Sequence, residues 1–124
     1  MKPTSVILID DNQTFLNAAT QFLDRQDKNN ISVLGSVTAG EDALKLVQEH
    51  HPDVVLLDLS MPGMSGIDMI PIIKDGVSDA AIIIVTLLDT LEYRKASIAA
   101  GADAFVSKAV FAIELMPTIQ RVVG

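Results

Sequence analysis

Five short apolar runs, separated by segments with a helical spacing of apolar residues, dominate this sequence. The runs cover residues 6–9, 31–37, 54–57, 81–85 and 104–106. In VILI, VVLL and AIIIV every side chain is apolar, which is typical of parallel strands covered by helices on both faces. Strands that alternate with helices are joined by right-handed crossovers. The sequence therefore predicts an α/β domain with a doubly wound parallel sheet.

Polar residues at the ends of the intervening segments predict where the helices begin. Thr38-x-x-Glu41 has the pattern of a capping box, in which two side chains satisfy the first free amides of a helix. Ser65 is expected to cap the next helix, and Asp89-x-x-Glu92 to start the one after it.

Glycine and proline mark further boundaries. Gly66 is expected to let backbone segments approach closely, and Gly101 stands where a residue in the left-handed conformation would end a helix. Pro71 and Pro117 fall inside two predicted helices, where proline removes a backbone hydrogen bond. We therefore expect irregular or delayed starts for these two helices.

The composition argues against several classes of protein. Hydrophobic residues make up 49% of the 124 residues and charged residues 20%, which favours one folded domain over disorder. No apolar run approaches the ~20 residues of a membrane span, the N-terminus lacks the features of a signal peptide, and there is no cysteine. We expect a cytoplasmic protein with no membrane association. The net charge of -7 also opposes direct binding to nucleic acid.

Polar residues of the kinds that catalyse reactions or bind metals follow four of the apolar runs. Asp10 and Asp11 follow the first, Asp58 the third, Thr86 the fourth, and Lys108 lies just after the fifth. The carboxyl ends of parallel strands meet at one edge of the sheet, so these side chains should converge. Three carboxylates without a cation would repel one another. Ligands that are all oxygen favour Mg²⁺ or Mn²⁺ over Zn²⁺, so we expect a divalent metal site.

These residues lie in motifs of a known family. The motifs are the acid pair in LIDDN, the aspartate in VVLLDLSMPGMSG, the threonine in IIIVT and the lysine in GADAFVSK. In this order, each at a strand end, they resemble the receiver domain of the bacterial response-regulator family, over about residues 4–124. The resemblance implies one receiver domain, residues 1–124, with the flavodoxin-like (βα)5 fold and strand order 2-1-3-4-5. LDTLEYRKASIAAGADAFVSKA further resembles the subfamily whose receivers precede a helix-turn-helix DNA-binding domain.

The resemblance implies a role for each acidic residue. Asp58 would be the phosphoacceptor, with its carboxylate attacking phosphorus. Asp11 would ligate Mg²⁺ (or Mn²⁺) directly, and Asp10 directly or through water. Asp58 and the backbone carbonyl of Ser60 would complete the protein ligands of the metal.

The resemblance also implies how the domain would respond to a phosphoryl group on Asp58. Lys108 would pair with one phosphoryl oxygen, and Thr86 would hydrogen-bond another. As Thr86 moves, Phe105 would turn inward and reshape the face made by the fourth helix, fifth strand and fifth helix. Phe105 stands where tyrosine is more familiar in the family, and it has no hydroxyl for an outward hydrogen bond.

Two residues depart from the family pattern. Leu87 follows Thr86 where many relatives have alanine or glycine, and it should narrow the approach of water and small phosphodonors to Asp58. Ala109 follows Lys108 where many relatives have proline, often with a cis peptide, so the geometry of the Lys108–Ala109 peptide stays open.

The resemblance implies a signalling protein and its partners. A sensor histidine kinase or a phosphotransfer protein would donate the phosphoryl group, and the output would be transcriptional, through a DNA-binding domain outside this chain. Whether phosphorylation produces a homodimer stays open. The chain would not be an enzyme, beyond slow autophosphatase activity at most.

Two alternative functions remain. One is a receiver-like interaction module that no longer takes phosphate. The other is a small Mg²⁺-dependent aspartyl-phosphate phosphatase of the haloacid dehalogenase type. That chemistry usually requires Asp-x-Asp after the first strand, whereas this chain has Asp10-Asp11-Asn12.

Overall fold

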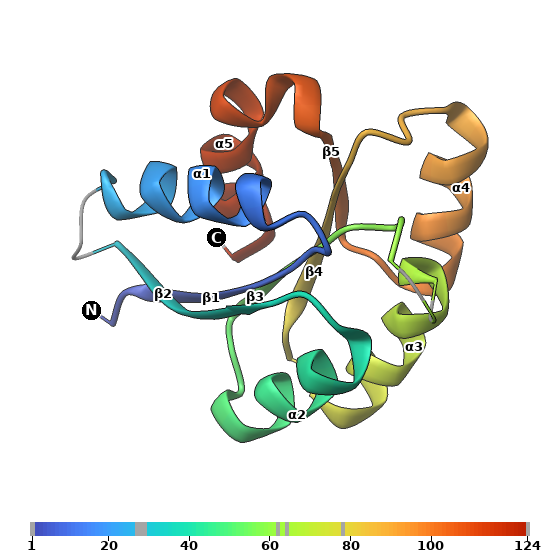
Figure 1. Cartoon of the computed structure of the whole chain (residues 1–124), viewed down its shortest axis with the longest axis horizontal. Coiled ribbons are helices and arrows are strands. Elements are labelled where there is room, and N and C mark those ends of the chain that lie inside the picture. The colour runs from blue at the N-terminus through green and yellow to red at the C-terminus, as the bar shows by residue number, and fades with distance from the viewer. Residues whose placement is uncertain (1, 27–29, 62, 64, 78, 124) are drawn as a thin grey trace.

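The computed structural model describes residues 2–26, 30–61, 63, 65–77 and 79–123. Its strands form one parallel sheet in the order β2-β1-β3-β4-β5, which confirms the predicted fold and strand order (Figure 1). The strands are β1 (Thr4–Ile9), β2 (Ile31–Val37), β3 (Val54–Leu57), β4 (Ala81–Thr86) and β5 (Ala104–Ser107).

Helices cover both faces of the sheet. They are α1 (Gln13–Asp24), α2 (Gly40–His50), α3 (Gly66–Gly76), α4 (Leu91–Ala100) and α5 (Phe111–Val123), with a 3₁₀ turn η1 at Lys108–Val110. Figure 1 shows α1 and α5 on one face, and α2, α3 and α4 on the other. Within the described residues, no helix has both the length and the apolar character needed to cross a membrane.

The two faces of the sheet bury two separate apolar cores. Successive side chains of a strand point to opposite faces. Ile7 and Ile9 therefore join the core under α2 and α3, while Val6 and Leu8 join the core under α1 and α5. Every residue of β3 and β4 is buried, as the continuous apolar runs predict.

Parallel pairing aligns the carboxyl ends of the inner strands. Ile9 pairs with Leu57, and Leu57 with Ile84. The residues that follow β1 and β3 therefore leave the sheet side by side. Two backbone hydrogen bonds extend the ladder by one residue, from Asp10 N–H to Val37 O and from Asp58 N–H to Ile9 O.

Two predicted helix starts are wrong by one residue. The N-cap of α2 is Ala39, which forms no side-chain cap, so Thr38 lies outside the helix and the predicted capping box with Glu41 does not form. The N-cap of α4 is Thr90, whose hydroxyl accepts a hydrogen bond from Tyr93 N–H, and not Asp89. In each case the capping pattern requires one particular residue at the N-cap, and tertiary packing selects its neighbour.

Other boundary predictions are confirmed. Ser65 caps α3 by accepting a hydrogen bond from Ile67 N–H, and Gly101 ends α4 with φ 116°. The described residues contain no cis peptide, so the Lys108–Ala109 peptide is trans.

The two prolines do not disturb the helix starts in the predicted way. Pro71 lies inside α3, which begins without delay directly after Ser65. The 3₁₀ turn η1 makes the entry to α5 irregular, but Pro117 lies well inside α5. A proline beyond the first turn removes one hydrogen bond locally and leaves the position of the N-cap unchanged.

Candidate functional site

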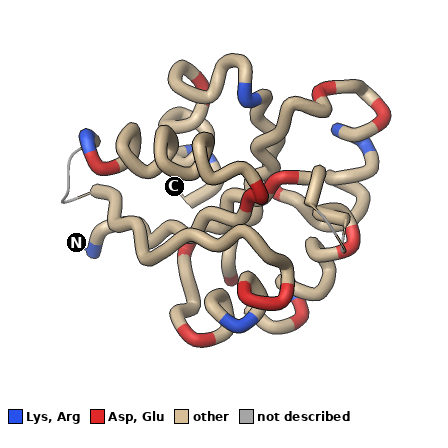
Figure 2. Tube along the Cα trace, viewed as in Figure 1, with Lys and Arg blue, Asp and Glu red and all other residues tan. Residues whose placement is uncertain are grey.

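Three carboxylates meet at the carboxyl edge of the sheet. Asp10, Asp11 and Asp58 each offer an oxygen, and these oxygens all lie within 4.8 Å of one another. Figure 2 shows a group of acidic positions near the centre of the molecule. Asp10 and Asp58 are buried, with 2% and 4% of their surface exposed, whereas Asp11 is exposed.

Local hydrogen bonds hold the first acid and the start of α1 together. Asn12 N–H donates to Asp10 Oδ1 over 2.9 Å, and Asn12 Oδ1 accepts from Phe15 N–H over 3.0 Å. Asn12 is therefore both the N-cap of α1 and a brace for the Asp10 carboxylate.

Lys108 supplies a positive charge to the site. Its Nζ lies 2.7 Å from Asp10 Oδ2 in an ion pair, and it donates to Asp58 Oδ2 over 3.4 Å. On another side, the same Nζ lies 4.3 Å from the centre of the Phe15 ring. Only 9% of the Lys108 side chain is exposed, so these groups replace most of its hydration.

The site holds more negative charge than Lys108 can balance. Burial raises the pKa of Asp10, and the neighbouring Asp58 charge adds to this effect, while Lys108 and the Asn12 N–H oppose it. Among the described residues, Asp58 Oδ1 is buried and accepts no hydrogen bond, and Asp10 Oδ2 has only the Lys108 ammonium beside it. Buried carboxylate oxygens with so few donors, gathered at one point, suit a divalent cation with oxygen ligands.

A cleft opens above Asp58. Its lining residues are Asp11, Asn12, Asp58, Ser60, Thr86, Leu87, Leu88 and Lys108. Thr86 is fully buried, and its hydroxyl accepts a hydrogen bond from Leu88 N–H over 3.3 Å. The Leu87 side chain is 71% exposed, so an apolar side chain stands at the mouth of the cleft.

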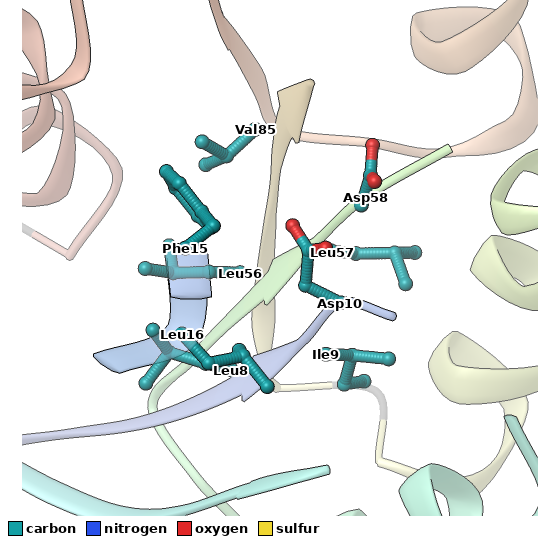
Figure 3. A pocket seen from close by; sticks show the side chains of 9 residues that line it. All are labelled: Leu8, Ile9, Asp10, Phe15, Leu16, Leu56, Leu57, Asp58 and Val85. Carbon is teal, nitrogen blue, oxygen red and sulfur yellow. The ribbon is translucent and has the colours of Figure 1, made fainter. Parts of the chain in front are cut away.

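A second, narrow pocket lies beneath the acids. Figure 3 shows Asp10 and Asp58 on one side of it and Phe15 on the other, above the apolar side chains of β1 and β3. The acids are therefore supported from below by apolar groups that offer them no hydrogen bond.

Phe105 lies in β5, away from the acid cluster. Its ring is partly buried against the core under α3, and the Arg94 guanidinium lies 4.7 Å from the ring centre. Arg94 Nε also donates to Asp89 Oδ1 over 2.6 Å, and this ion pair lowers the pKa of the Asp89 carboxyl. Arg94 thus connects the loop after β4 to the outer face of Phe105.

The structure brings together the polar residues that the sequence nominated, and adds two that sequence reasoning missed. Phe15 follows Asp11 by four residues, about one helical turn, and this spacing is the signal in the sequence that could have indicated it. Arg94 has no comparable signal in the sequence. Its spacing of five residues from Asp89 does not indicate an ion pair unless the start of α4 is already known.

The fold and the site together define a doubly wound α/β domain with an acid-rich site at the carboxyl edge of its parallel sheet. Residues 6–120 match the family model described as the response regulator receiver domain, and the chain belongs to this family. The resemblance predicted from the motifs is therefore confirmed.

Named relatives are transcriptional regulators. The chain is 30% identical to the transcriptional regulatory protein MctR of Rhizobium johnstonii, over 96% of this chain and 55% of that protein. It is 30% identical to the response regulator GacA of Pseudomonas aeruginosa, over 94% of this chain and 54% of that protein. The chain therefore spans about half the length of these relatives.

Solved structures agree with the family. A LuxR-family DNA-binding response regulator from Staphylococcus aureus is 31% identical, with a TM-score of 0.88 over 98% of this chain and 99% of that chain. The receiver domain of the putative response regulator NarL from Mycobacterium tuberculosis has a TM-score of 0.90 over 99% of this chain and 98% of that chain. At 24% identity, this second likeness concerns the fold.

Proposed function

We propose that this chain is a phosphorylation-dependent switch that accepts a phosphoryl group on Asp58 from a sensor histidine kinase or a phosphotransfer protein. The observation that supports the proposal is the cluster of Asp10, Asp11 and Asp58 at the carboxyl edge of the sheet, with the Lys108 ammonium against two of them, Asp10 and Asp58. Of the three acids, Asp58 is buried and also opens into the cleft.

The residues of the site divide the chemistry among them. An Asp58 oxygen attacks phosphorus, a P–O bond forms, and the P–N bond to the donor imidazole breaks. Lys108 stabilises the negative charge on the transferred group, and Thr86 is close enough to share the cleft. Asp10, Asp11, Asp58 and the Ser60 carbonyl would hold Mg²⁺ (or Mn²⁺), and the ion would supply positive charge against the phosphoryl oxygens.

The switch begins at Thr86. Its hydroxyl accepts from Leu88 N–H, which leaves its own proton to donate to a phosphoryl oxygen, a strong acceptor that would draw Thr86 toward it. Movement of Thr86 displaces the loop that leads to α4. Phe105 then turns inward, away from Arg94, and the face of α4, β5 and α5 changes shape. Signalling requires only a few kcal/mol between the two states.

The rest of the system follows from the family. Residues 1–124 form one receiver domain that acts in the cytoplasm, and its output is transcriptional, through a DNA-binding domain. Two relatives' names support this proposal, one a transcriptional regulatory protein and the other a DNA-binding response regulator. The domain does not itself bind nucleic acid or a membrane. It has no enzymatic activity beyond slow release of its own phosphate. Size-exclusion chromatography before and after phosphorylation tests whether a homodimer forms.

A phosphate-independent interaction module is the second candidate. The exposed Leu87 side chain at the mouth of the cleft favours it, because an apolar group there hinders phosphodonors. The phosphatase alternative is disfavoured, because Asn12 occupies the position of the second catalytic acid and uses its side chain to cap α1.

Intact mass after incubation with Mg²⁺ and acetyl phosphate tests the proposal. We expect one added phosphoryl group on the wild type and none on Asp58→Asn or in EDTA. If purified histidine kinase and acetyl phosphate both leave the wild type and Leu87→Ala unmodified, the interaction module is correct and the proposal is wrong.

A further inference from the structure

The ammonium of Lys108 is held from three directions. Two are carboxylates, with Asp10 Oδ2 at 2.7 Å and Asp58 Oδ2 at 3.4 Å. The third is the face of the Phe15 ring, with its centre 4.3 Å from Nζ. A cation at this distance is attracted by the negative charge of the ring face, more strongly when water is excluded. With 9% of its side chain exposed, Lys108 is in that desolvated regime.

The three contacts differ in what happens to them during phosphorylation. A divalent cation held by Asp10 and Asp58 competes with Lys108 for both carboxylates, and a phosphoryl group on Asp58 removes the negative charge from one of its oxygens. The ring of Phe15 is a ligand neither for a divalent metal ion nor for phosphate. Among the described contacts of Lys108, it is therefore the one that persists when the site is loaded.

The ring is itself firmly placed. Phe15 lies in the first turn of α1, directly after the Asn12 cap that also braces Asp10. Its ring meets Phe111 of α5 edge-on, at 5.2 Å between centres and 72° between planes. Phe22, two turns along α1, also meets Phe111 in an edge contact, at 5.6 Å and 74°. The position of the ring is thus determined by the packing of α1 against α5.

We propose that Phe15 is a positioning residue of the phosphorylation site, whose ring face keeps the Lys108 ammonium directed at the phosphoryl position. This inference rests on phosphoryl acceptance at Asp58. It assigns to an α1 aromatic side chain a role in charge placement that is distinct from filling the core.

The aromatic cluster provides a matched control. Phe15 and Phe22 are both partly buried, both lie in α1, and both make an edge contact with Phe111. Only Phe15 has a described contact with Lys108. Phe15→Leu and Phe22→Leu therefore remove the same atoms and one similar aromatic contact, but only the first removes the ring face from Lys108.

The first measurement is the rate constant for phosphorylation by acetyl phosphate at saturating Mg²⁺. We expect Phe15→Leu to slow the reaction about 5- to 30-fold, the factor that corresponds to loss of a desolvated cation–ring contact. Phe15→Tyr keeps the ring face and should restore the rate to within about threefold of the wild type. Phe22→Leu should leave the rate within the same margin, although its urea midpoint should fall as far as that of Phe15→Leu.

The second measurement does not depend on phosphorylation. In protein labelled with ¹³C-lysine, the Hε resonances of Lys108 should be displaced upfield by the ring current of Phe15. The displacement should disappear in Phe15→Leu and persist in Phe15→Tyr and Phe22→Leu. The resonances of Lys108 are assigned by their absence from the spectrum of Lys108→Met.

The outcomes separate the inference from the proposed function. If wild-type Asp58 accepts no phosphoryl group from any donor, the proposed function fails and the positioning role fails with it. If the wild type is phosphorylated and both leucine variants slow equally, Phe15 acts through core packing alone and the inference is wrong. Equal rates in Phe15→Leu and wild type, or an unshifted Lys108 resonance, also overturn it.

Discussion

Gly66 is the residue at which a single methyl group should most directly disturb the site. It is the first residue of α3, and a Cβ built there would lie 2.6 Å from Leu59 Cα and closer still to the carbonyl oxygen of Asp58. Gly66 N–H also donates to Leu59 O over 3.1 Å. The close approach predicted from the sequence is therefore confirmed, and the segment it touches begins at the proposed phosphoacceptor.

The cost of Gly66→Ala follows from these distances. Ordinary contact begins at 3.4 Å, so the backbones must separate by roughly 0.8 Å. No side-chain rotation relieves the clash, because the opposing atoms belong to the backbone. Overpacking of this kind costs up to about 3 kcal/mol, and the reduced entropy of the unfolded chain returns about 0.5–1 kcal/mol. We expect a net loss of about 2 kcal/mol in the free energy of unfolding.

Urea unfolding followed by circular dichroism measures this loss. With a slope of about 2 kcal/mol per molar urea, the midpoint should fall by about 1 M, with an unchanged slope. Gly76→Ala is the matched control at the other end of α3, because its Cβ would meet only the flexible Gln48 side chain at 3.4 Å. That variant should be more stable than the wild type by about 0.5–1 kcal/mol. A midpoint for Gly66→Ala at or above the wild-type value would refute the reasoning.

Three further variants test the electrostatics and access of the site. Burial raises the pKa of Asp10 above its ordinary value of 3.8, so its protonated form favours folding, and this contribution is lost as the pH rises through the raised pKa. Asp10→Asn is neutral at every pH, so its urea midpoint should exceed that of the wild type at pH 7 in EDTA but not at pH 3. An equal difference in urea midpoint between variant and wild type at the two pH values would contradict this. Arg94→Gln should raise the pKa of the Asp89 carboxyl toward its ordinary value and shift the Phe105 ring resonances, both measured by NMR titration. An Asp89 titration curve that does not change would show that the ion pair is absent in solution. Leu87→Ala should speed both autodephosphorylation and phosphorylation by acetyl phosphate, because the exposed leucine narrows the cleft mouth. Unchanged rates would mean that Leu87 leaves the path to Asp58 open.

Helix boundaries show where prediction from the sequence reached its limit. Ser65 and Gly101 act as predicted, since each meets a local requirement, a side-chain acceptor for free amides and a left-handed backbone. Thr38 and Asp89 fit the capping pattern equally well, yet Ala39 and Thr90 are the N-caps. Asp89 and Thr90 are both good N-caps, but alanine is a poorer N-cap than threonine, so local capping preference alone does not determine where α2 begins.

The sequence by itself determined the fold, the strand order implied by the family, and the set of polar residues at the strand ends. Apolar runs bury both faces of a parallel sheet, and such a sheet places the residues that follow its strands at one edge. The fold class and the gathering of these residues at one edge depend on pattern and chain order alone, whereas the strand order is what the resemblance to the family implied.

Only the tertiary structure decided which groups surround each charge. The position of Lys108 between Asp10 and the Phe15 ring joins η1 to the loop after β1 and the first turn of α1, which lie far earlier in the chain. The contact of Arg94 with Phe105 likewise depends on how α4 lies against β5. Directional contacts between side chains require distances and angles that no residue spacing specifies, because they form only after the helices have packed against the sheet.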